Sequence, residues 1–115
     1  MGLTVYGIKN CDSVKKARKW LEESGKDYRF ADFRVDGLDA ADLDNWISNC
    51  GWETILNRRS TSWKNLPEAA RSNVDEASAR QLMLDNPTLI KRPVTVTGSK
   101  VLVGFKAESY AAEFG

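Results

Sequence analysis

The stretch that decides the fold is residues 3–17, which read LTVYGIKNCDSVKKA. Its first six residues are rich in β-branched and aromatic side chains, a composition typical of a buried strand over residues 3–8. A short polar turn follows, in which Asn10 or Asp12 can cap a helix. The stretch therefore predicts a strand that leads directly into a helix, with Cys11 at the junction.

The helix and the strand after it are indicated by periodicity. Val14, Ala17 and Leu21 recur at helical spacing, and Gly25 is the residue type expected just beyond a helix C-terminus. Residues 28–35 are typical of a second strand. A strand, a helix and another strand in this order predict a parallel pair joined by a right-handed crossover.

The rest of the chain predicts a helical region and then a hairpin. A helix ending at Gly51 presents an apolar stripe of Leu43, Trp46, Ile47 and Cys50. A second helix over 75–84 turns Ala79, Leu82 and Met83 inward and is broken at Asn86-Pro87. Strands at 94–96 and 101–103, with a turn over 97–100, precede a helix over 107–114.

We therefore expect an α/β protein with a four-stranded mixed sheet and a helical insertion between strands 2 and 3. The length of 115 residues predicts one domain over 1–115. The net charge is +1, from 17 Lys and Arg against 16 Asp and Glu, which favours neither nucleic acid nor a membrane as partner. No apolar run has the length of a membrane helix, and the first eight residues do not resemble a signal peptide. We expect a cytoplasmic monomer.

Histidine is absent, so catalysis through a histidine base is excluded and the commonest metal ligand is missing. Two distant cysteines cannot build a four-cysteine zinc site, so no metal site is expected. In a cytoplasmic protein the cysteines are expected to be thiols.

Cys11 is the candidate nucleophile. A helix N-terminus favours an anion, so a thiol placed there loses its proton more readily, and Lys15 one turn later adds positive potential. The alternative is a small buried side chain at a strand end. Cys50, in an apolar stripe, is interpreted as a core residue, with a resolving thiol as the alternative.

Two arginine-bearing segments are candidates for binding anions. Arg58 and Arg59 lie in a polar loop, where a guanidinium can hold a carboxylate or a tetrahedral oxyanion. The alternative is an ordinary solvated loop charge. Arg92 precedes Pro93 at the entry to a strand, which indicates either a special backbone site such as a cis bond or an ordinary strand-start proline.

These segments together resemble the ArsC-like family, which includes glutaredoxin-coupled arsenate reductases, Spx-type transcriptional regulators and YffB-like proteins. The four motifs that carry the resemblance are YGIKNCDSVKKA, ILNRRST, IKRPV and VGF. They span nearly the whole chain, and the YffB-like branch is the nearest. The resemblance implies a thioredoxin-like fold with a helical insertion.

The resemblance also implies site residues. Cys11 is implied as the active thiol. Asn10 and Lys15, which lie beside it in the sequence, are expected to bind substrate, as are Arg59, Arg92 and Pro93. Pro93 is implied as a cis-proline that faces the thiol, with Arg92 next to it. Arg59 matches the family's loop arginine, and Arg58 is its neighbour.

Two departures from the family pattern bear on function. Arsenate reductases of the family carry a further arginine near the last strand, where this chain has Val103-Gly104-Phe105. Spx-type regulators carry Cys-x-x-Cys, whereas here Val14 stands at the second cysteine position. YffB-like proteins are regarded as glutathione-dependent thiol reductases, and neither departure conflicts with that activity.

The expected function is accordingly that of a glutathione-linked thiol–disulfide oxidoreductase. Its partners would be glutathione, glutaredoxin and a disulfide or mixed-disulfide substrate, with glutathione as co-substrate and no bound cofactor. The alternatives are a glutaredoxin-coupled arsenate reductase and a non-enzymatic Spx-like regulator that binds RNA polymerase.

Overall fold

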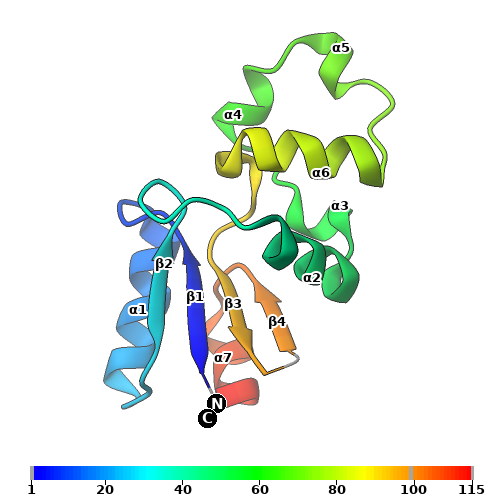
Figure 1. The fold of residues 1–115 in the computed structure, drawn as a ribbon. Helices are drawn as coiled ribbons and strands as arrows, with labels where there is room; N and C mark the ends of the chain where they lie inside the picture. The colour runs from blue at the N-terminus through cyan, green and yellow to red at the C-terminus, as the bar shows by residue number, and fades with distance from the viewer. Residues whose placement is uncertain (1, 99, 115) are drawn as a thin grey trace. The chain divides into compact units, whose positions relative to one another are not determined.

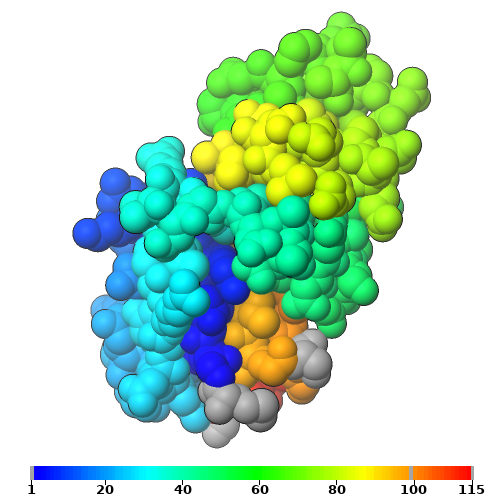
Figure 2. All heavy atoms as spheres, viewed as in Figure 1, coloured from blue at the N-terminus to red at the C-terminus, as the bar shows by residue number. Residues whose placement is uncertain are grey.

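The computed structural model describes residues 2–98 and 100–114 and contains a four-stranded sheet (Figure 1). The strand order across the sheet is β2-β1-β3-β4. The strands are β1 (Leu3–Gly7), β2 (Arg29–Asp32), β3 (Val94–Thr97) and β4 (Lys100–Val103). In Figure 2 the atoms of β2, β1 and β3 lie side by side as cyan, blue and orange bands.

The pairing of the strands follows the predicted topology. Strand β1 runs parallel to β2 and antiparallel to β3, and β3 is antiparallel to β4. The turn predicted over 97–100 is bounded by a Thr97–Lys100 pair. Ser99, inside that turn, lies outside the described residues. The predicted mixed α/β sheet with a helical insertion between the second and third strands is confirmed.

One row of side chains across the sheet faces two helices. The paired residues Phe30, Val5, Thr95 and Leu102 form this row. Tyr110 packs on it, is fully buried, and hydrogen-bonds to Thr95 through its hydroxyl. The cluster is completed by Ala17, Trp20 and Leu21 of α1 (Asp12–Glu23) and Phe114 of α7 (Ala107–Phe114). Burial of this apolar row fixes both helices on one face of the sheet.

Helix α1 begins and ends as its sequence requires. The predicted stripe of Val14, Ala17 and Leu21 is fully buried. At the C-terminus Gly25 has a φ of +70°, and the N–H groups of Gly25 and Lys26 donate to the carbonyls of Glu22 and Leu21. This pattern is a Schellman motif, which uses the conformational freedom of glycine to satisfy the last carbonyls.

Strand β2 is shorter than predicted. It covers Arg29–Asp32, whereas the sequence predicted a strand over 28–35. The chain turns at Asp32 because the carbonyl of this residue accepts the N–H groups of Val35 and Asp36. Backbone bonds to Asp32 thus end the strand three residues before the predicted boundary.

Residues 38–91 form a compact helical unit of their own. Helix α2 (Ala40–Cys50) presents the predicted stripe, with Leu43, Trp46 and Ile47 buried and Cys50 partly buried. Within this unit, a β-bridge joins Leu56 to Ile90, and an ion pair joins Arg80 to Asp44. The helices of this unit are α2 (Ala40–Cys50), α3 (Trp52–Ile55), α4 (Thr61–Lys64), α5 (Glu68–Arg71), α6 (Glu76–Asp85) and the 3₁₀ helix η1 (Pro87–Leu89).

Helix α6 matches the expected helix except at one residue. Asp75 caps it by accepting the N–H of Ser78, and Ala79 and Met83 are buried as expected. Leu82 was expected inward and is only partly buried. The other unit comprises the sheet with α1 and α7, up to residue 37 and from 92 onward. A single domain over 1–115 therefore stays a prediction.

Within residues 2–98 and 100–114, no helix combines the length and the apolar character needed to cross a bilayer.

Candidate functional site

The loop after β1 carries Cys11 to the start of α1. Strand β1 ends at Gly7, and the Cys11 N–H donates to the carbonyl of Ile8 at 3.1 Å, which closes the turn. Cys11 itself is the N-cap, with φ −90° and ψ 129°. The expectation that Asn10 or Asp12 caps the helix is therefore wrong, because Asp12 is already the first helical residue.

A close contact between strand and helix holds this start in place. A Cβ added to Gly7 would lie 2.6 Å from Cγ2 of Val14, a distance that packed carbon atoms do not reach. Val14 is fully buried, so its methyl groups have no free volume to move into. Glycine at position 7 thus lets α1 approach the end of β1 closely.

Sheet pairing brings Arg92 and Pro93 to the same end of the sheet as Cys11. Because Tyr6 pairs with Val94 in antiparallel register, the residues before Val94 lie beside those after Tyr6. The Arg92–Pro93 peptide bond is cis, Pro93 is buried, and its carbonyl accepts the N–H of Gly104 at 2.8 Å.

The surroundings of Cys11 favour the thiolate. Partial burial opposes ionisation, yet the pKa of Cys11 is held below its ordinary value by several donors. The N–H groups of Val14 and Ser13 at the helix start point at the sulfur, and the Arg92 guanidinium adds a hydrogen bond and a positive charge. The N-cap of α1 makes no side-chain hydrogen bond to these N–H groups, so they are available as donors to the sulfur.

The other residues predicted beside Cys11 are exposed. Asn10 lies in the turn before the helix, and Lys15 lies one turn along α1, where its N–H donates to the Cys11 carbonyl at 2.9 Å. The Lys15 ammonium is not among the groups that lower the pKa of Cys11. The side-chain cation that acts on the thiol is thus Arg92, whereas the sequence predicted Lys15 for this role.

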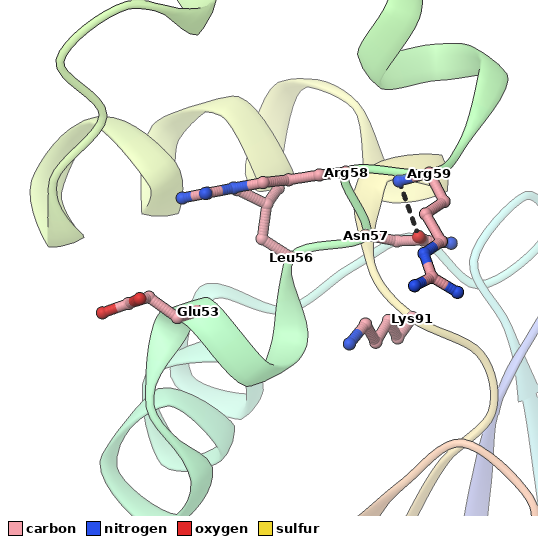
Figure 3. Close-up of a pocket in the computed structure, with 6 residues that line it drawn as sticks. All are labelled: Glu53, Leu56, Asn57, Arg58, Arg59 and Lys91. Carbon is pink, nitrogen blue, oxygen red and sulfur yellow. Dashed lines mark hydrogen bonds between the residues drawn. The ribbon is translucent and has the colours of Figure 1, made fainter.

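Arg59 lies in the helical unit, in a cavity of about 390 Å³ lined mainly by polar and charged side chains (Figure 3). Its backbone N–H donates to the Asn57 side chain at 3.1 Å. The Arg59 and Lys91 side chains lie on one side of the cavity, and Arg58 and Glu53 on the other. The lining residues are Glu53, Leu56, Asn57, Arg58, Arg59 and Lys91.

Arg58 is more than a solvated loop charge. Its guanidinium carbon lies 5.6 Å from the ring centroid of Trp52 and 5.8 Å from that of Trp63, which is cation–π geometry. With Lys91, whose N–H donates to the Ile55 carbonyl, the two arginines give the cavity a positive character. Such a cavity suits a carboxylate or another oxyanion.

Cys50 lies at the last residue of α2, and neither cysteine is in a disulfide. Partial burial raises the pKa of Cys50. This supports the interpretation of Cys50 as a packing residue. Within the described part of the chain, no group of three Cys, Asp or Glu side chains is arranged to hold a metal ion.

Sequence reasoning missed Asp32. It is buried at the end of β2, and its carboxylate accepts the N–H groups of Lys9 and Arg34. A signal was present, since a carboxylate between Ala31 and Phe33 in a predicted strand needs partners of its own wherever that strand is buried. The close approach at Gly7 was also missed, and nothing in a single sequence indicates it.

Comparison with known proteins places the chain in a family. Residues 6–113 match the ArsC family. The chain belongs to the ArsC family. Its fold is accordingly the thioredoxin-like fold of that family, a thiol oxidoreductase type of architecture with a helical insertion.

Two solved structures show the likeness in detail. An ArsC-family YffB protein shares 46% identity and a TM-score of 0.95, covering 98% of this chain and 99% of its own. A protein from Brucella melitensis described as related to arsenate reductase (ArsC) shares 54% identity and a TM-score of 0.78. That match covers 99% of this chain and 95% of the other.

The ArsC relatives also include regulators. The global transcriptional regulator Spx 2 of Bacillus cereus is 26% identical over 109 residues, which are 90% of this chain and 80% of the regulator. The relatives of this chain therefore include a protein described as related to arsenate reductase and a protein described as a transcriptional regulator.

Proposed function

We propose that this ArsC-family chain is a glutathione-dependent thiol–disulfide oxidoreductase in which the Cys11 thiolate reacts. The observation that carries the proposal is the thiol at the start of α1, with its pKa lowered by helix N–H donors and by Arg92. A thiolate, and not a thiol, attacks a disulfide sulfur. A thiol at this position therefore ionises more readily than an ordinary cysteine and is the better candidate for the nucleophile.

The reaction proceeds by two exchanges. Cys11 thiolate attacks the glutathione sulfur of a mixed disulfide, a Cys11–glutathione disulfide forms, and the substrate leaves as its thiolate. A second glutathione thiolate then attacks the glutathione sulfur bound to Cys11. Oxidised glutathione leaves and the Cys11 thiolate is restored. Val14 stands where a second cysteine would be needed for internal resolution, so an external thiol completes the cycle.

Binding is assigned to the groups near the thiol and in the basic cavity. The Arg92 guanidinium holds a carboxylate of the substrate, and the backbone preceding Pro93 pairs with the extended peptide. Asn10 and Lys15 contact the substrate from the exposed side of the helix start. In the helical unit, Arg59 is the candidate for binding a carboxylate in its own cavity, and the positive character of that cavity supports the role.

Arsenate reduction is the second candidate, favoured by the description of the Brucella relative and by the donors gathered at Cys11. Against it stands the last strand region. Gly104 donates its N–H to Pro93, and Phe105 packs edge-on against Tyr110 with ring centroids 4.9 Å apart. Neither can hold an oxyanion by its side chain. A regulatory role like that of Spx is the third candidate.

The experiment compares turnover of a glutathionylated peptide and of arsenate, each with glutathione, in the wild type, Cys11→Ser and Cys50→Ser. The proposal expects peptide turnover that is lost in Cys11→Ser and kept in Cys50→Ser. Mass spectrometry should show one glutathione on Cys11 after treatment with oxidised glutathione. Efficient arsenate turnover would favour the second candidate. Glutathionylation of Cys11 without turnover of either substrate would contradict the enzyme proposal and favour a regulator.

A further inference from the structure

The Asp32 carboxylate joins the loop that carries Cys11 to the end of β2. Its Oδ2 accepts the Lys9 N–H at 3.1 Å, and its Oδ1 accepts the Arg34 N–H at 2.8 Å. Asp32 is 9% exposed and stands opposite Gly7 in the parallel pairing of β1 with β2. One carboxylate oxygen thus accepts a bond from the loop after β1 and the other from the loop after β2, and both loops leave the same end of the sheet.

The bond from the Lys9 N–H to Asp32 matters for Cys11 because Lys9 lies in the same turn. Lys9 stands two residues before Cys11, in a turn whose other closure is the bond from the Cys11 N–H to the Ile8 carbonyl. A second bond, from the Phe33 N–H to the Gly7 carbonyl at 2.8 Å, continues the pairing of the two chain segments beyond the strands. The path from β1 to Cys11 is therefore held at Gly7, at Lys9 and at Cys11 itself.

A buried carboxylate is costly unless its partners compensate for the lost hydration. A turn after a strand can be closed by backbone bonds alone, and the Asp32 carbonyl already accepts the N–H groups of Val35 and Asp36. The turn after β2 thus has backbone bonds in addition to the bond from the Arg34 N–H to Oδ1. What Oδ2 adds is a link to the Cys11 loop.

We propose that Asp32 is a positioning residue for Cys11, which holds the loop over residues 8–11 so that the sulfur stays at the start of α1 and beside Arg92. The inference rests on the proposed function for the identity of the reacting thiol. Asp32 does not touch the sulfur or exchange a proton with it. Its effect is transmitted through the Lys9 N–H and the backbone between Lys9 and Cys11.

Position and charge make opposite predictions, which allows a sharp test. If Asp32 acted on Cys11 only as a nearby negative charge, its removal would stabilise the thiolate and lower the pH at which Cys11 reacts. If it positions the loop, its removal lets the sulfur move away from its donors, and Cys11 reacts at higher pH. The direction of the change distinguishes the two roles.

The test uses the full chain with Asp32→Asn and Asp32→Ala. An amide at position 32 has a single acceptor oxygen and can serve the Lys9 or the Arg34 N–H but not both. The matched control is Asp75→Asn, because Asp75 also accepts a backbone N–H, that of Ser78, but lies in the other unit. Iodoacetamide labelling of Cys11 is followed against pH by peptide mass spectrometry, and hydrogen exchange of the Lys9 amide is followed by NMR.

We expect the midpoint of Cys11 labelling to move to higher pH in Asp32→Asn and further in Asp32→Ala. Labelling at pH 6 should slow about two- to tenfold, and exchange of the Lys9 amide should accelerate by a similar factor, as for one lost hydrogen bond. The control should match the wild type in both measurements. An unchanged or lower midpoint in folded Asp32→Asn would overturn the proposal. Unfolding of both variants would also overturn it, because Asp32 would then support the whole sheet and not the loop.

Labelling requires neither glutathione nor turnover. Absence of glutathione-dependent activity in the wild type would contradict the proposed function and leave this measurement intact. A midpoint that does not move would contradict the positioning role, whatever the activity.

Discussion

Cys11 and Cys50 are both partly buried thiols, yet they lie at opposite ends of helices. Cys11 is the N-cap of α1, where helix N–H groups point at the sulfur, and its pKa is lowered. Cys50 is the last residue of α2, and burial raises its pKa. The N-terminal end of a helix favours an anion and the C-terminal end disfavours one.

The comparison shows that exposure does not decide which thiol reacts. Burial opposes ionisation at both positions. At Cys11 that cost is outweighed by directed donors, Val14, Ser13 and Arg92, whereas at Cys50 the effect of burial prevails and the pKa is raised. Each prediction below changes one side of this contrast and leaves the other as an internal control.

The largest expected effect is that of removing each sulfur in turn. Cys11→Ser should reduce glutathione-linked turnover by at least about a thousandfold, because a hydroxyl without a neighbouring base stays protonated. Serine is a good N-cap, so the fold should persist, which circular dichroism checks. Cys50→Ser should keep most of the activity. Comparable losses in the two variants would remove the distinction between the thiols.

Gly7→Ala should disturb the start of α1. The added Cβ meets Val14, and relieving that overlap should cost about 1–3 kcal/mol of the free energy of unfolding. Because the Val14 N–H is a donor to the sulfur, labelling of Cys11 at pH 6 should slow while that of Cys50 does not change.

Gly25→Ala is the matched control for this change. It forces a side chain into a positive φ at the other end of the same helix, at a cost of about 1–2 kcal/mol. It should therefore destabilise the protein, as measured by urea unfolding, without changing Cys11 labelling. If both alanine variants slow Cys11 equally, the reactivity depends on overall stability and not on the helix start.

Replacing Arg92 removes a side-chain cation that acts on the sulfur. Arg92→Met should raise the pKa of Cys11 and slow its labelling at pH 6 about two- to tenfold, as expected for a lost hydrogen bond in a partly exposed site. Lys15→Met should have little effect on labelling, since the exposed ammonium is not among the groups acting on the thiol. A larger effect at Lys15 would restore the assignment made from sequence.

The smallest expected effect is a pH dependence of stability with opposite signs. The lowered pKa of Cys11 contributes stability that is present above the unfolded pKa, about 8.5, and is lost as pH falls through the folded pKa. The raised pKa of Cys50 contributes stability that is present below the unfolded value and is lost as pH rises through the folded pKa.

Urea unfolding over a series of pH values measures this contrast. The stability of the wild type relative to Cys11→Ser should rise between pH 6 and pH 9, and that relative to Cys50→Ser should fall at alkaline pH. Slopes of the same sign for both variants would show that one of the two pKa directions is wrong.

Much of the fold follows from periodicity in the sequence. The stripes of α1 and α2 and the β-branched runs of β1, β3 and β4 were predicted because burial repeats over several turns or residues. The four-residue helices α3, α4 and α5 were not predicted, because one turn of helix has no period to detect. The length of β2 was overestimated because the strand ends in a turn made by backbone bonds from Val35 and Asp36 to the Asp32 carbonyl, which no periodicity in the sequence indicates.

The candidate site was predictable only in part. Cys11 follows from the change from strand to helix pattern, and Arg92 was named from the strand-start proline and the family resemblance. That Arg92 and not Lys15 acts on the sulfur depends on the register of β1 against β3, which a single sequence does not specify. The substrate-binding roles of Asn10, Lys15, Arg59, Arg92 and Pro93 stay predictions.

The pairing of β1 with two strands has a consequence for the newly made chain. Tyr6 pairs with Ala31, from which only helix α1 separates it in the sequence. Its other partner, Val94, is synthesised only after the whole helical unit. Closing the longer loop costs more chain entropy, so the partner that delivers Arg92 arrives last. Until then the nascent Cys11 lacks its cation and behaves more like an ordinary thiol.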